Sequence, residues 1–505
     1  MAIPLFNSIA SWFLKKRIHQ IELFLKYPHE VQQEVLNDLL RISKNTEVGK
    51  RYDFSSIRNY QTFKSRAPLV AYEDIADDIN RSRNGQANIY WPTPIKWFAK
   101  SSGTTDSRSK FIPVSLEALD QCHYKAGKDM LSFYFNNNPE SELFNGKNLR
   151  LGGSQEIYDN STSYFGDLSA IIIDNMPFWA EISSTPSHKT SLIPEWEAKI
   201  NAILKESVLE NVTSFAGVPS WMMVLLNKVL EHTKKDNILE VWPNLEVFFH
   251  GGVSFKPYKS QYEIFFPGSQ LKYYETFNAS EGFFGIQDLN NSDELLLMLD
   301  YGIFYEFIPV DGSVDDIIPL AGVVLFESYE MVITTNSGLW RYKIGDVIKF
   351  TSVAPYRIQV VGRTKHFINA FGEELMVDNA DLALAKAAQT TGVNIIDYTA
   401  APVYMSGNEK GAHQWLIEFD KVPEDLNRFS VVLDKVLREI NSDYDAKRYK
   451  NMTMKFPEVI PAGSKLFYNW LSKNKKLGGQ HKVPRLSNNR ELIEELLKLN
   501  TTKPL

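Results

Sequence analysis

The chain has 505 residues, which predicts more than one domain, and its 44% hydrophobic and 23% charged residues are typical of a folded globular protein. Its net charge of −6, from 55 basic and 61 acidic residues without a long basic block, argues against a nucleic-acid partner. The single cysteine, Cys122, excludes an internal disulfide and fits a reducing cytoplasm, and the chain has no run of about 18 apolar residues, so no stable membrane association is expected.

The first half of the chain predicts helices, followed by an alternation of buried strands and helices. Apolar stripes lie on both sides of Pro28 in the first forty residues: Ile21, Phe24 and Leu25, then Val31, Val35, Leu36 and Leu39. Short apolar runs predict strands at 97–99, 168–173 and 245–249, with stretches of helical length and spacing between them. This alternation predicts an α/β core with partly parallel sheets.

The second half changes its pattern twice. Closely spaced strands are expected at 323–325, 331–335, 347–350 and 357–361, as an antiparallel meander in a β-barrel-like unit. Beyond Gly362, the chain predicts a small α+β domain with helices at 378–389 and 429–440, two short final helices, and strands at 394–404, 413–419 and 452–459. We therefore expect a large N-terminal domain, residues 1–362, and a smaller C-terminal domain, residues 363–505.

A hydroxyl-rich loop, Ser101-Ser102-Gly103-Thr104-Thr105, follows the strand predicted at 97–99, and Lys110 comes shortly after it. Hydroxyls and backbone N–H groups can surround a phosphate, glycine allows a close approach, and a lysine adds positive charge. The glycine-lysine pair of the P-loop is missing. The segment is therefore either a different kind of phosphate-binding loop or an ordinary polar surface loop.

Two further segments place an aromatic ring or a carboxylate after a predicted strand. Phe277 can stack on a purine, and Glu281, four residues on, can hold Mg²⁺, which takes oxygen ligands and bridges phosphates. Asp346, after Ile344-Gly345, can accept both hydroxyls of a ribose. The alternatives are an ordinary turn with a solvated glutamate and a hairpin turn, since Gly-Asp is common in turns.

Two polar segments of the second half suit a domain that moves. Gly362-Arg363-Thr364-Lys365 and the following residues 369–374 lie at the change of composition, where a hinge is expected. Gly478-Gly479-Gln480-His481-Lys482 is a glycine-rich loop that ends in a lysine. The alternative for this loop is a solvated basic surface segment.

The order of these segments resembles the adenylate-forming enzymes, the superfamily of acyl-CoA ligases and luciferases. Within it, the chain most closely resembles the Gretchen Hagen 3 family of acyl-acid amido synthetases. The hydroxyl-rich loop, Ala279-Ser280-Glu281-Gly282 and Tyr342-Lys343-Ile344-Gly345-Asp346 are similar to three motifs of that family. The resemblance covers nearly the whole chain, including 45–49, 68–74 and 217–222, and departs from the family at Ser107 and Glu374, where a glycine and, in plant members, a lysine are found.

The resemblance implies an enzyme with two half-reactions. A carboxylic acid attacks the α-phosphate of ATP, with Mg²⁺ as cofactor, and an amine, here expected to be an amino acid, then displaces AMP from the acyl-adenylate. A mobile C-terminal domain with its hinge at Lys365 would bring Lys482 to the first step and withdraw it for the second. The implied catalytic residues are Lys482 and Glu281, and Glu281 is the implied metal ligand.

The resemblance also implies two sets of binding residues. The ATP-binding set is Ser101, Ser102, Gly103, Thr104, Thr105, Lys110, Gly251, Gly252, Phe277, Ser280, Asp346 and Arg363. The acyl-substrate pocket is expected to include Val218, Trp221 and Met222, at a predicted helix start. Core packing is the alternative for these three residues, because an apolar helix face looks the same in both cases.

Two other functions remain open from the residues. An enzyme similar to the acyl-CoA ligases would pass the acyl group to a thiol, and the sequence does not separate a thiol from an amine. A nucleotide-binding protein without turnover would act as a sensor or scaffold, but it would not need Glu281, Asp346 and Lys482 together. The acid, the acceptor and the oligomeric state are not determined by the sequence.

Overall fold

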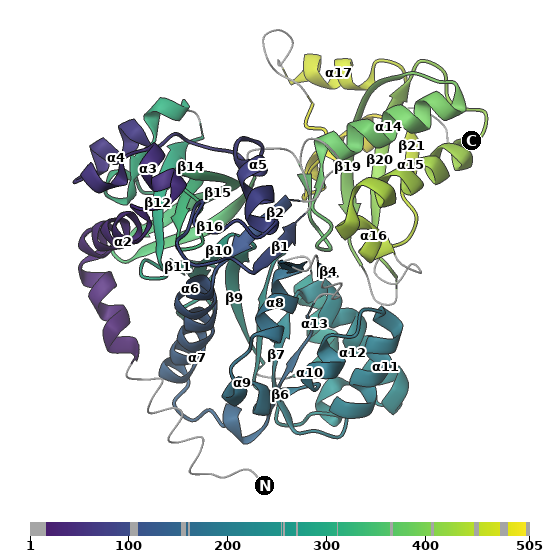
Figure 1. Cartoon of the computed structure of the whole chain (residues 1–505). Coiled ribbons are helices and arrows are strands. Elements are labelled where there is room, and N and C mark those ends of the chain that lie inside the picture. Colours follow the sequence, from purple (N-terminus) through teal and green to yellow (C-terminus); the bar gives the residue numbers. More distant parts are fainter. Residues whose placement is uncertain are drawn as a thin grey trace.

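The computed structural model describes residues 17–101, 110–152, 158–159, 162–253, 255, 258–268, 271–310, 312–363, 367–405, 409–448, 454–474 and 483–500. These residues form a mixed α/β fold with a large part, residues 17–363, and a C-terminal part, residues 367–500 (Figure 1). The predicted fold class is confirmed. The exact domain boundary and the mobility of the second domain stay predictions. No helix within the described ranges is long and apolar enough to cross a membrane.

One mixed sheet organises the large part. Its strand order is β13-β12-β14-β15-β16-β11-β10-β9-β8-β7-β3-β6, and β3 pairs in parallel with β6 and β7, as β8 does with β7 and β9. The strands are β3 (Lys147–Arg150), β6 (Ser184–Thr185), β7 (Val212–Gly217), β8 (Val247–Gly251), β9 (Lys272–Ala279), β10 (Gly282–Ile286), β11 (Leu295–Leu297), β12 (Ile303–Pro309), β13 (Ile318–Pro319), β14 (Ser328–Thr335), β15 (Tyr342–Val353) and β16 (Tyr356–Arg363). The predicted parallel core and the antiparallel meander are thus two ends of one sheet.

A second sheet lies beside the first and carries the hydroxyl-rich segment. Its order is β2-β1-β5-β4, from β1 (Trp97–Ser101), β2 (Lys110–Val114), β4 (Tyr158–Asp159) and β5 (Tyr164–Gly166). The strands β1 and β2 are antiparallel, and Ser101 is the register partner of Lys110. The segment between them therefore starts and ends at neighbouring positions.

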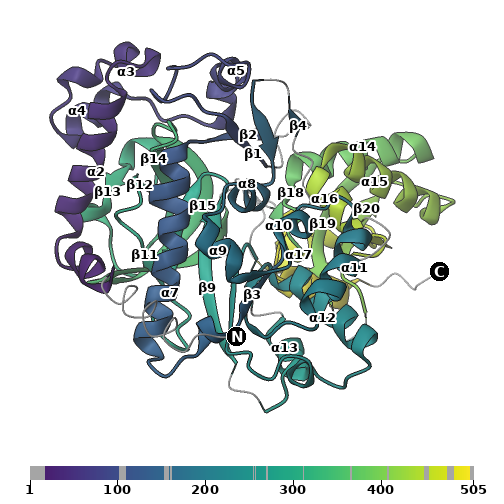
Figure 2. The ribbon, with the colours of Figure 1, turned by 60° about the horizontal axis from the view of Figure 1, so that its bottom comes forward.

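Helices cover both faces of the parallel strands (Figures 1 and 2). On one face, Tyr134 of α7 (Lys125–Asn137) packs against Phe249, and on the other, α12 (Pro219–Thr233) and α13 (Lys259–Phe265) enclose Phe248. Successive strand residues point to opposite faces, so Phe248 and Phe249 belong to different cores. The other helices of the large part are 17–26, α2 (Pro28–Ser43), α3 (Glu47–Arg51), α4 (Tyr60–Arg66), α5 (Tyr72–Arg83), α6 (Leu116–Ala118), α8 (Leu168–Asp174), α9 (Phe178–Ile182), α10 (His188–Ser191) and α11 (Trp196–Ser207).

Two of the predicted strands are wrong. Residues 168–173 belong to helix α8, because a short apolar run fits a buried helix as well as a buried strand, and Leu168 and Ile171 are buried one turn apart. Val323 and Leu325 follow a 3₁₀ turn, Leu320–Gly322, and form no strand; Leu325 is exposed and has no apolar face to pack against.

The C-terminal part is the predicted α+β unit. It contains β17 (Phe367–Ile368), β18 (Leu375–Met376), β19 (Ile395–Val403), β20 (Ala412–Phe419), β21 (Glu458–Pro461), α14 (Val377–Thr391), α15 (Leu426–Ile440), α16 (Ser442–Arg448), α17 (Leu466–Lys473) and α18 (Glu491–Leu499). The apolar stripe of α15 is buried through Phe429, Leu433 and Leu437. Phe371 and Trp415 of this part share one apolar cluster with Phe248 and Tyr262 of the large part.

Candidate active site

The carboxyl ends of the parallel strands lie side by side and bring several predicted segments together. Gly217 pairs with His250 and Gly251 pairs with Thr276, so the segments after β7 and β8 run beside β9. Ligands of open α/β sheets bind at this kind of edge. The edge is therefore the place to look for the site.

Gly251 allows the backbone of β8 to approach β9 closely. A Cβ atom at this position would lie 2.6 Å from both the carbonyl oxygen and the Oγ1 of Thr276. Thr276 Oγ1 donates a hydrogen bond to the carbonyl oxygen of His250 and lies 3.5 Å from Asn278 Oδ1. A larger side chain at 251 would disturb this polar edge, and the space fits the predicted approach of a nucleotide to the backbone.

The predicted metal and purine residues lie on the β9–β10 hairpin. Ser280 and Glu281 form its turn, since Ala279 pairs with Gly282. Phe277 is buried and its ring packs 5.0 Å from that of Phe284, so stacking on a purine stays a prediction. Among the described residues, no group of three or more His, Cys, Asp or Glu is arranged to hold a metal ion.

Asp346 and Arg363 are brought together by the β15–β16 pairing. They are register partners, and Asp346 is buried. Arg363 is the last residue of β16, just before the predicted hinge, whose Lys365 lies outside the described residues. Ser102, Gly103, Thr104, Thr105 and Lys482 also lie outside them, so their predicted roles stay predictions.

The loop of residues 369–374, called here the junction loop, connects the C-terminal part to this edge. Asn369 Nδ2 donates to the carbonyl oxygen of Gly252, 3.2 Å away, and its Oδ1 accepts from the backbone N–H of Glu374. Ser101 Oγ donates to Glu374 Oε2 at 3.5 Å. The junction loop therefore touches both the hydroxyl-rich segment and the end of β8.

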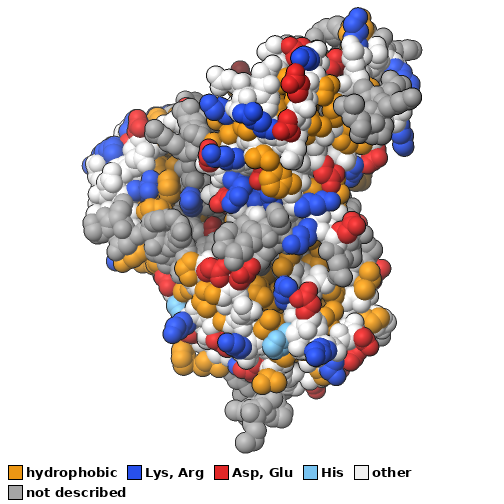
Figure 3. Space-filling view, turned by 90° about the vertical axis from the view of Figure 1, so that its right-hand side faces the viewer, with side chains coloured by type: hydrophobic (Ala, Val, Ile, Leu, Met, Phe, Trp, Pro, Cys, Tyr) orange, Lys and Arg blue, Asp and Glu red, His pale blue; other side chains and the backbone are white. Residues whose placement is uncertain are grey.

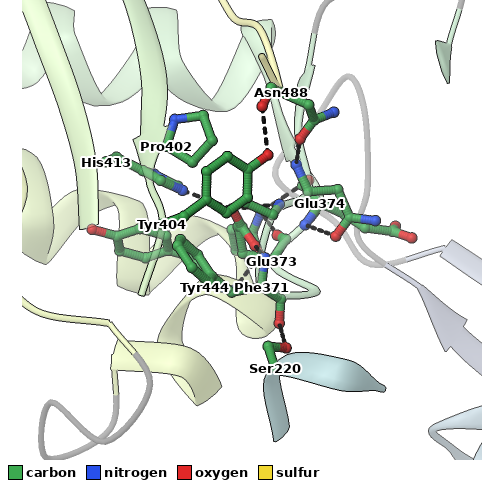
Figure 4. Close-up of polar contacts among 12 residues, drawn as sticks. Ser220, Phe371, Glu373, Glu374, Pro402, Tyr404, His413, Tyr444 and Asn488 are labelled. Atoms are coloured by element: carbon green, nitrogen blue, oxygen red, sulfur yellow. Dashed lines mark hydrogen bonds and ion pairs between the residues drawn. The ribbon is translucent and has the colours of Figure 1, made fainter. Parts of the chain in front are cut away.

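A buried ion pair fixes the junction loop from inside (Figure 4). Glu373 and His413, both fully buried, are 2.7 Å apart through Oε1 and Nε2. The Glu373 carboxylate also accepts hydrogen bonds from the backbone N–H groups of Ala370 and Phe371. Sequence reasoning missed His413, because no local signal marks a histidine forty residues from its partner.

The predicted acyl-pocket residues have more than one neighbour. Trp221 Nε1 and Ser220 Oγ both donate to the carbonyl oxygen of Phe371, so α12 holds the junction loop. Met222 is fully buried in the core, whereas Val218 is half-buried just before α12. The helix start is confirmed, and the pocket itself stays a prediction.

A charged cluster lies where α16 meets the large part. Lys447 is buried, its Nζ is 3.8 Å from the centroid of the Trp221 ring, and a Cβ at Gly372, where φ is +89°, would lie 3.2 Å from its Cε. Asp443, one turn earlier, and Asp167 before α8 are both half-buried. Burial raises the pKa of both carboxyls, and nearby Lys447 and Lys100 oppose the shift.

Asp443 makes the stability of this junction depend on pH. Burial raises its pKa to about 7, while Glu374 and Asp167 add to the rise. The folded protein therefore holds this proton more tightly than the unfolded chain, and the resulting stability is lost as the pH rises from about 4 to about 7.

The variant Asp443→Asn is expected to lack this loss. Its melting temperature should exceed that of the natural protein by a margin that widens from pH 4.5 to pH 7 and is constant above. Asp445→Asn, on the same helix in an ion pair with Arg438, is the control and should show no widening margin. A constant difference for Asp443→Asn over this range would contradict the prediction.

Cys122 is a buried core residue. Burial raises its thiol pKa to about 12, and its sulfur accepts from the backbone N–H of Phe283. The thiolate is the nucleophilic form of cysteine, so this residue is unsuited to covalent catalysis near neutral pH.

Comparisons with known proteins agree with this geometry. Models of the GH3 family match residues 17–271 (N-terminal domain), 296–363 (central domain) and 378–491 (C-terminal domain). Indole-3-acetic acid-amido synthetase GH3.4 of Arabidopsis thaliana is 26% identical over 466 residues, covering 76% of each chain. Jasmonoyl–L-amino acid synthetase JAR6 of Nicotiana attenuata is 24% identical over 468 residues, covering 76% of this chain and 78% of its own.

Two solved structures share the fold. The GH3.15 acyl acid amido synthetase matches with a TM-score of 0.62 at 18% identity, over 97% of this chain and 96% of its own. A 2-hydroxyisobutyryl-CoA ligase matches with a TM-score of 0.58 at 13% identity, over 94% of this chain and 92% of its own. Both cover the large and the C-terminal part.

Proposed function

The chain belongs to the GH3 family, and from this premise we propose that it is an acyl-acid amido synthetase, which activates a carboxylic acid with ATP as acyl-AMP and transfers the acyl group to an amine, in particular an amino acid. Its relatives are named amido synthetases of indole-3-acetic acid and of jasmonate. With one cysteine and no internal disulfide, the protein is proposed to work in a reducing cytoplasm.

The observation that carries the proposal is the junction loop. It links Gly252, at the end of β8, with Ser101, where the hydroxyl-rich segment begins. Two segments expected to bind ATP thus lie within reach of one loop of the C-terminal part. This is the arrangement that an enzyme needs when a second domain completes the site.

The residues have distinct roles in this proposal. The hydroxyl-rich segment from Ser101 to Thr105, with Lys110, surrounds the phosphates, and Gly251 and Gly252 allow the nucleotide to approach the backbone. Asp346 accepts the ribose hydroxyls, and Arg363 beside it adds positive charge. Mg²⁺, when bound, offsets charge on the phosphates, and Glu281 is the residue that would hold it. The polar, backbone-lined edge beside Thr276 fits such a substrate.

The decisive test is acid-dependent exchange of pyrophosphate into ATP, with a library of carboxylic acids. The proposal expects at least one acid to stimulate exchange and to give an amide when amino acids are added. Formation of a coenzyme A thioester instead would identify a thiol-acceptor ligase. If the folded protein shows no exchange with any acid, the enzyme proposal fails in favour of a nucleotide-binding protein.

Glu281→Gln is expected to raise the Mg²⁺ concentration for half-maximal exchange about tenfold, because a neutral amide is a poorer ligand for a hard cation. The measurement is a magnesium titration of the exchange rate at fixed ATP. Glu263→Gln, at an exposed position of α13, is the control. A titration curve for Glu281→Gln that overlays the natural one would remove Glu281 from the metal site.

A further inference from the structure

The charged cluster at the junction has a composition that the nucleotide site does not use. Asp443 and Lys447 come from α16 and lie one turn apart, while Lys100 and Asp167 come from the large part. The positions of these charges are coupled, since Lys447 and Lys100 both lower the pKa that burial raises at Asp443 and at Asp167. The junction thus brings two cations and two carboxylates together from elements distant in the sequence.

These opposite charges are near one another without being directly paired. Among the described residues, no ion pair within 4.0 Å involves Asp443, Asp167, Lys100 or Lys447. Lys447 instead has its Nζ over the Trp221 ring. Burying charges is costly unless each meets an opposite charge, so a direct pair is the arrangement that interface stability alone would favour. Charges held apart suit a ligand that carries both signs.

The cluster also adjoins the proposed adenylate site. Lys100 directly precedes Ser101 in β1, and Ser101 is hydrogen-bonded to Glu374 of the junction loop. Glu374 in turn acts on Asp443, whose pKa it raises. On the face shown in Figure 3, Lys and Arg side chains form a band across the middle of the molecule, where the C-terminal part meets the large part.

We propose that this cluster is the subsite for the acceptor and that it binds an α-amino acid as a zwitterion. Asp167 and Asp443 face the ammonium group, and Lys447 and Lys100 face the carboxylate. The inference rests on the proposed function, which supplies the acyl-adenylate, and it goes beyond that function by assigning the residues that select the acceptor.

The chemistry of the acceptor step agrees with this charge pattern. The ammonium loses a proton to a nearby carboxylate or to water, and the neutral amine nitrogen attacks the acyl carbon. The new C–N bond forms as the bond from that carbon to the AMP oxygen breaks, AMP leaves with the electron pair, and the nitrogen loses its second proton. Two carboxylates stabilise an ammonium before attack, whereas they would disfavour the thiolate that a thiol acceptor requires.

The test compares each amino acid with the amine that lacks its carboxylate, for example glycine with methylamine. The protein is expected to prefer the amino acid in kcat/KM by at least tenfold. Lys447→Met keeps an unbranched stem against Trp221 but removes the charge, and it should cut this preference at least tenfold through the KM of the amino acid. Because both acceptors are measured on the same variant, a change in adenylation cancels in the ratio.

The remaining arms separate the possible failures. Lys435→Met, an exposed lysine of α15 paired with Glu439, is the matched control and should keep the natural ratio. Asp443→Asn should weaken both acceptors, because both carry the ammonium. An unchanged glycine-to-methylamine ratio in Lys447→Met overturns the subsite, whereas absence of acid-dependent pyrophosphate exchange overturns the proposed function.

Direct binding judges the subsite even without turnover. In calorimetric titrations of the twenty common amino acids into the full chain with ATP, at least one should bind the natural protein and bind Lys447→Met at least tenfold more weakly. Equal affinity in the two proteins, or no binding to either, would overturn the proposal.

Discussion

Lys482→Ala is expected to slow acyl-adenylate formation about 10²- to 10³-fold, the usual cost of losing one group that stabilises charge in a transition state. The motivation is its place in the glycine-rich segment that resembles the family's lysine loop. The attack of the carboxylate on the α-phosphate builds negative charge on phosphate oxygens, and a lysine delivered there would stabilise it. The measurement is single-turnover formation of acyl-AMP from the acid found by pyrophosphate exchange.

The same variant should spare the second half-reaction. With synthetic acyl-adenylate supplied, amide formation by Lys482→Ala should stay within about twofold of the natural rate. Helix α17, which precedes Lys482 in the chain, lies on the side of the C-terminal part away from the large sheet (Figure 1). We therefore expect the C-terminal part to turn about the segment near Lys365 between the two steps. Normal acyl-AMP formation by the variant, or a single domain orientation with and without nucleotides, would refute this mechanism.

Glu373→Ala is expected to cost about 3–5 kcal/mol in the free energy of unfolding of the C-terminal part, because removing one partner leaves the other buried and unpaired. His413 would lose its only printed side-chain partner among the described residues, and the backbone N–H groups of Ala370 and Phe371 would lose their acceptor. The measurement is urea unfolding followed by tryptophan fluorescence. Glu424→Ala, in the exposed pair with Lys421, is the control.

The loss of Glu373 should also reach the nucleotide site through the junction loop. Asn369 and Glu374 depend on the shape of this loop for their contacts with Gly252 and Ser101. Amide hydrogen exchange in residues 369–374 should therefore rise, and the KM for ATP should increase, in the fraction that remains folded at low temperature. A Glu373→Ala protein as stable as Glu424→Ala, with unchanged exchange in the loop, would show that the pair does not hold the loop.

Much of the fold follows from local patterns. The 3.6-residue stripe of α15 and the closely spaced strands β14, β15 and β16 are periodic over enough residues to fix their type. The run at 168–173 is too short for its period to separate helix from strand, and its packing in α8 decides. The order of the motifs along the chain was sufficient to indicate the family that the domain comparisons then showed.

The sequence by itself determined the types of element, the polar segments and the family, because each depends on residues close together in the chain. Only the tertiary structure decided which segments meet. Ser101 and Glu374 are 273 positions apart, Glu373 and His413 are 40 apart, and Lys447 reaches Trp221 from another part of the molecule. Such contacts depend on strand order and on how the C-terminal part packs on α12, and no local period records either. The acceptor cluster could therefore not be read from the sequence, since each of its charges alone looks like an ordinary solvated residue.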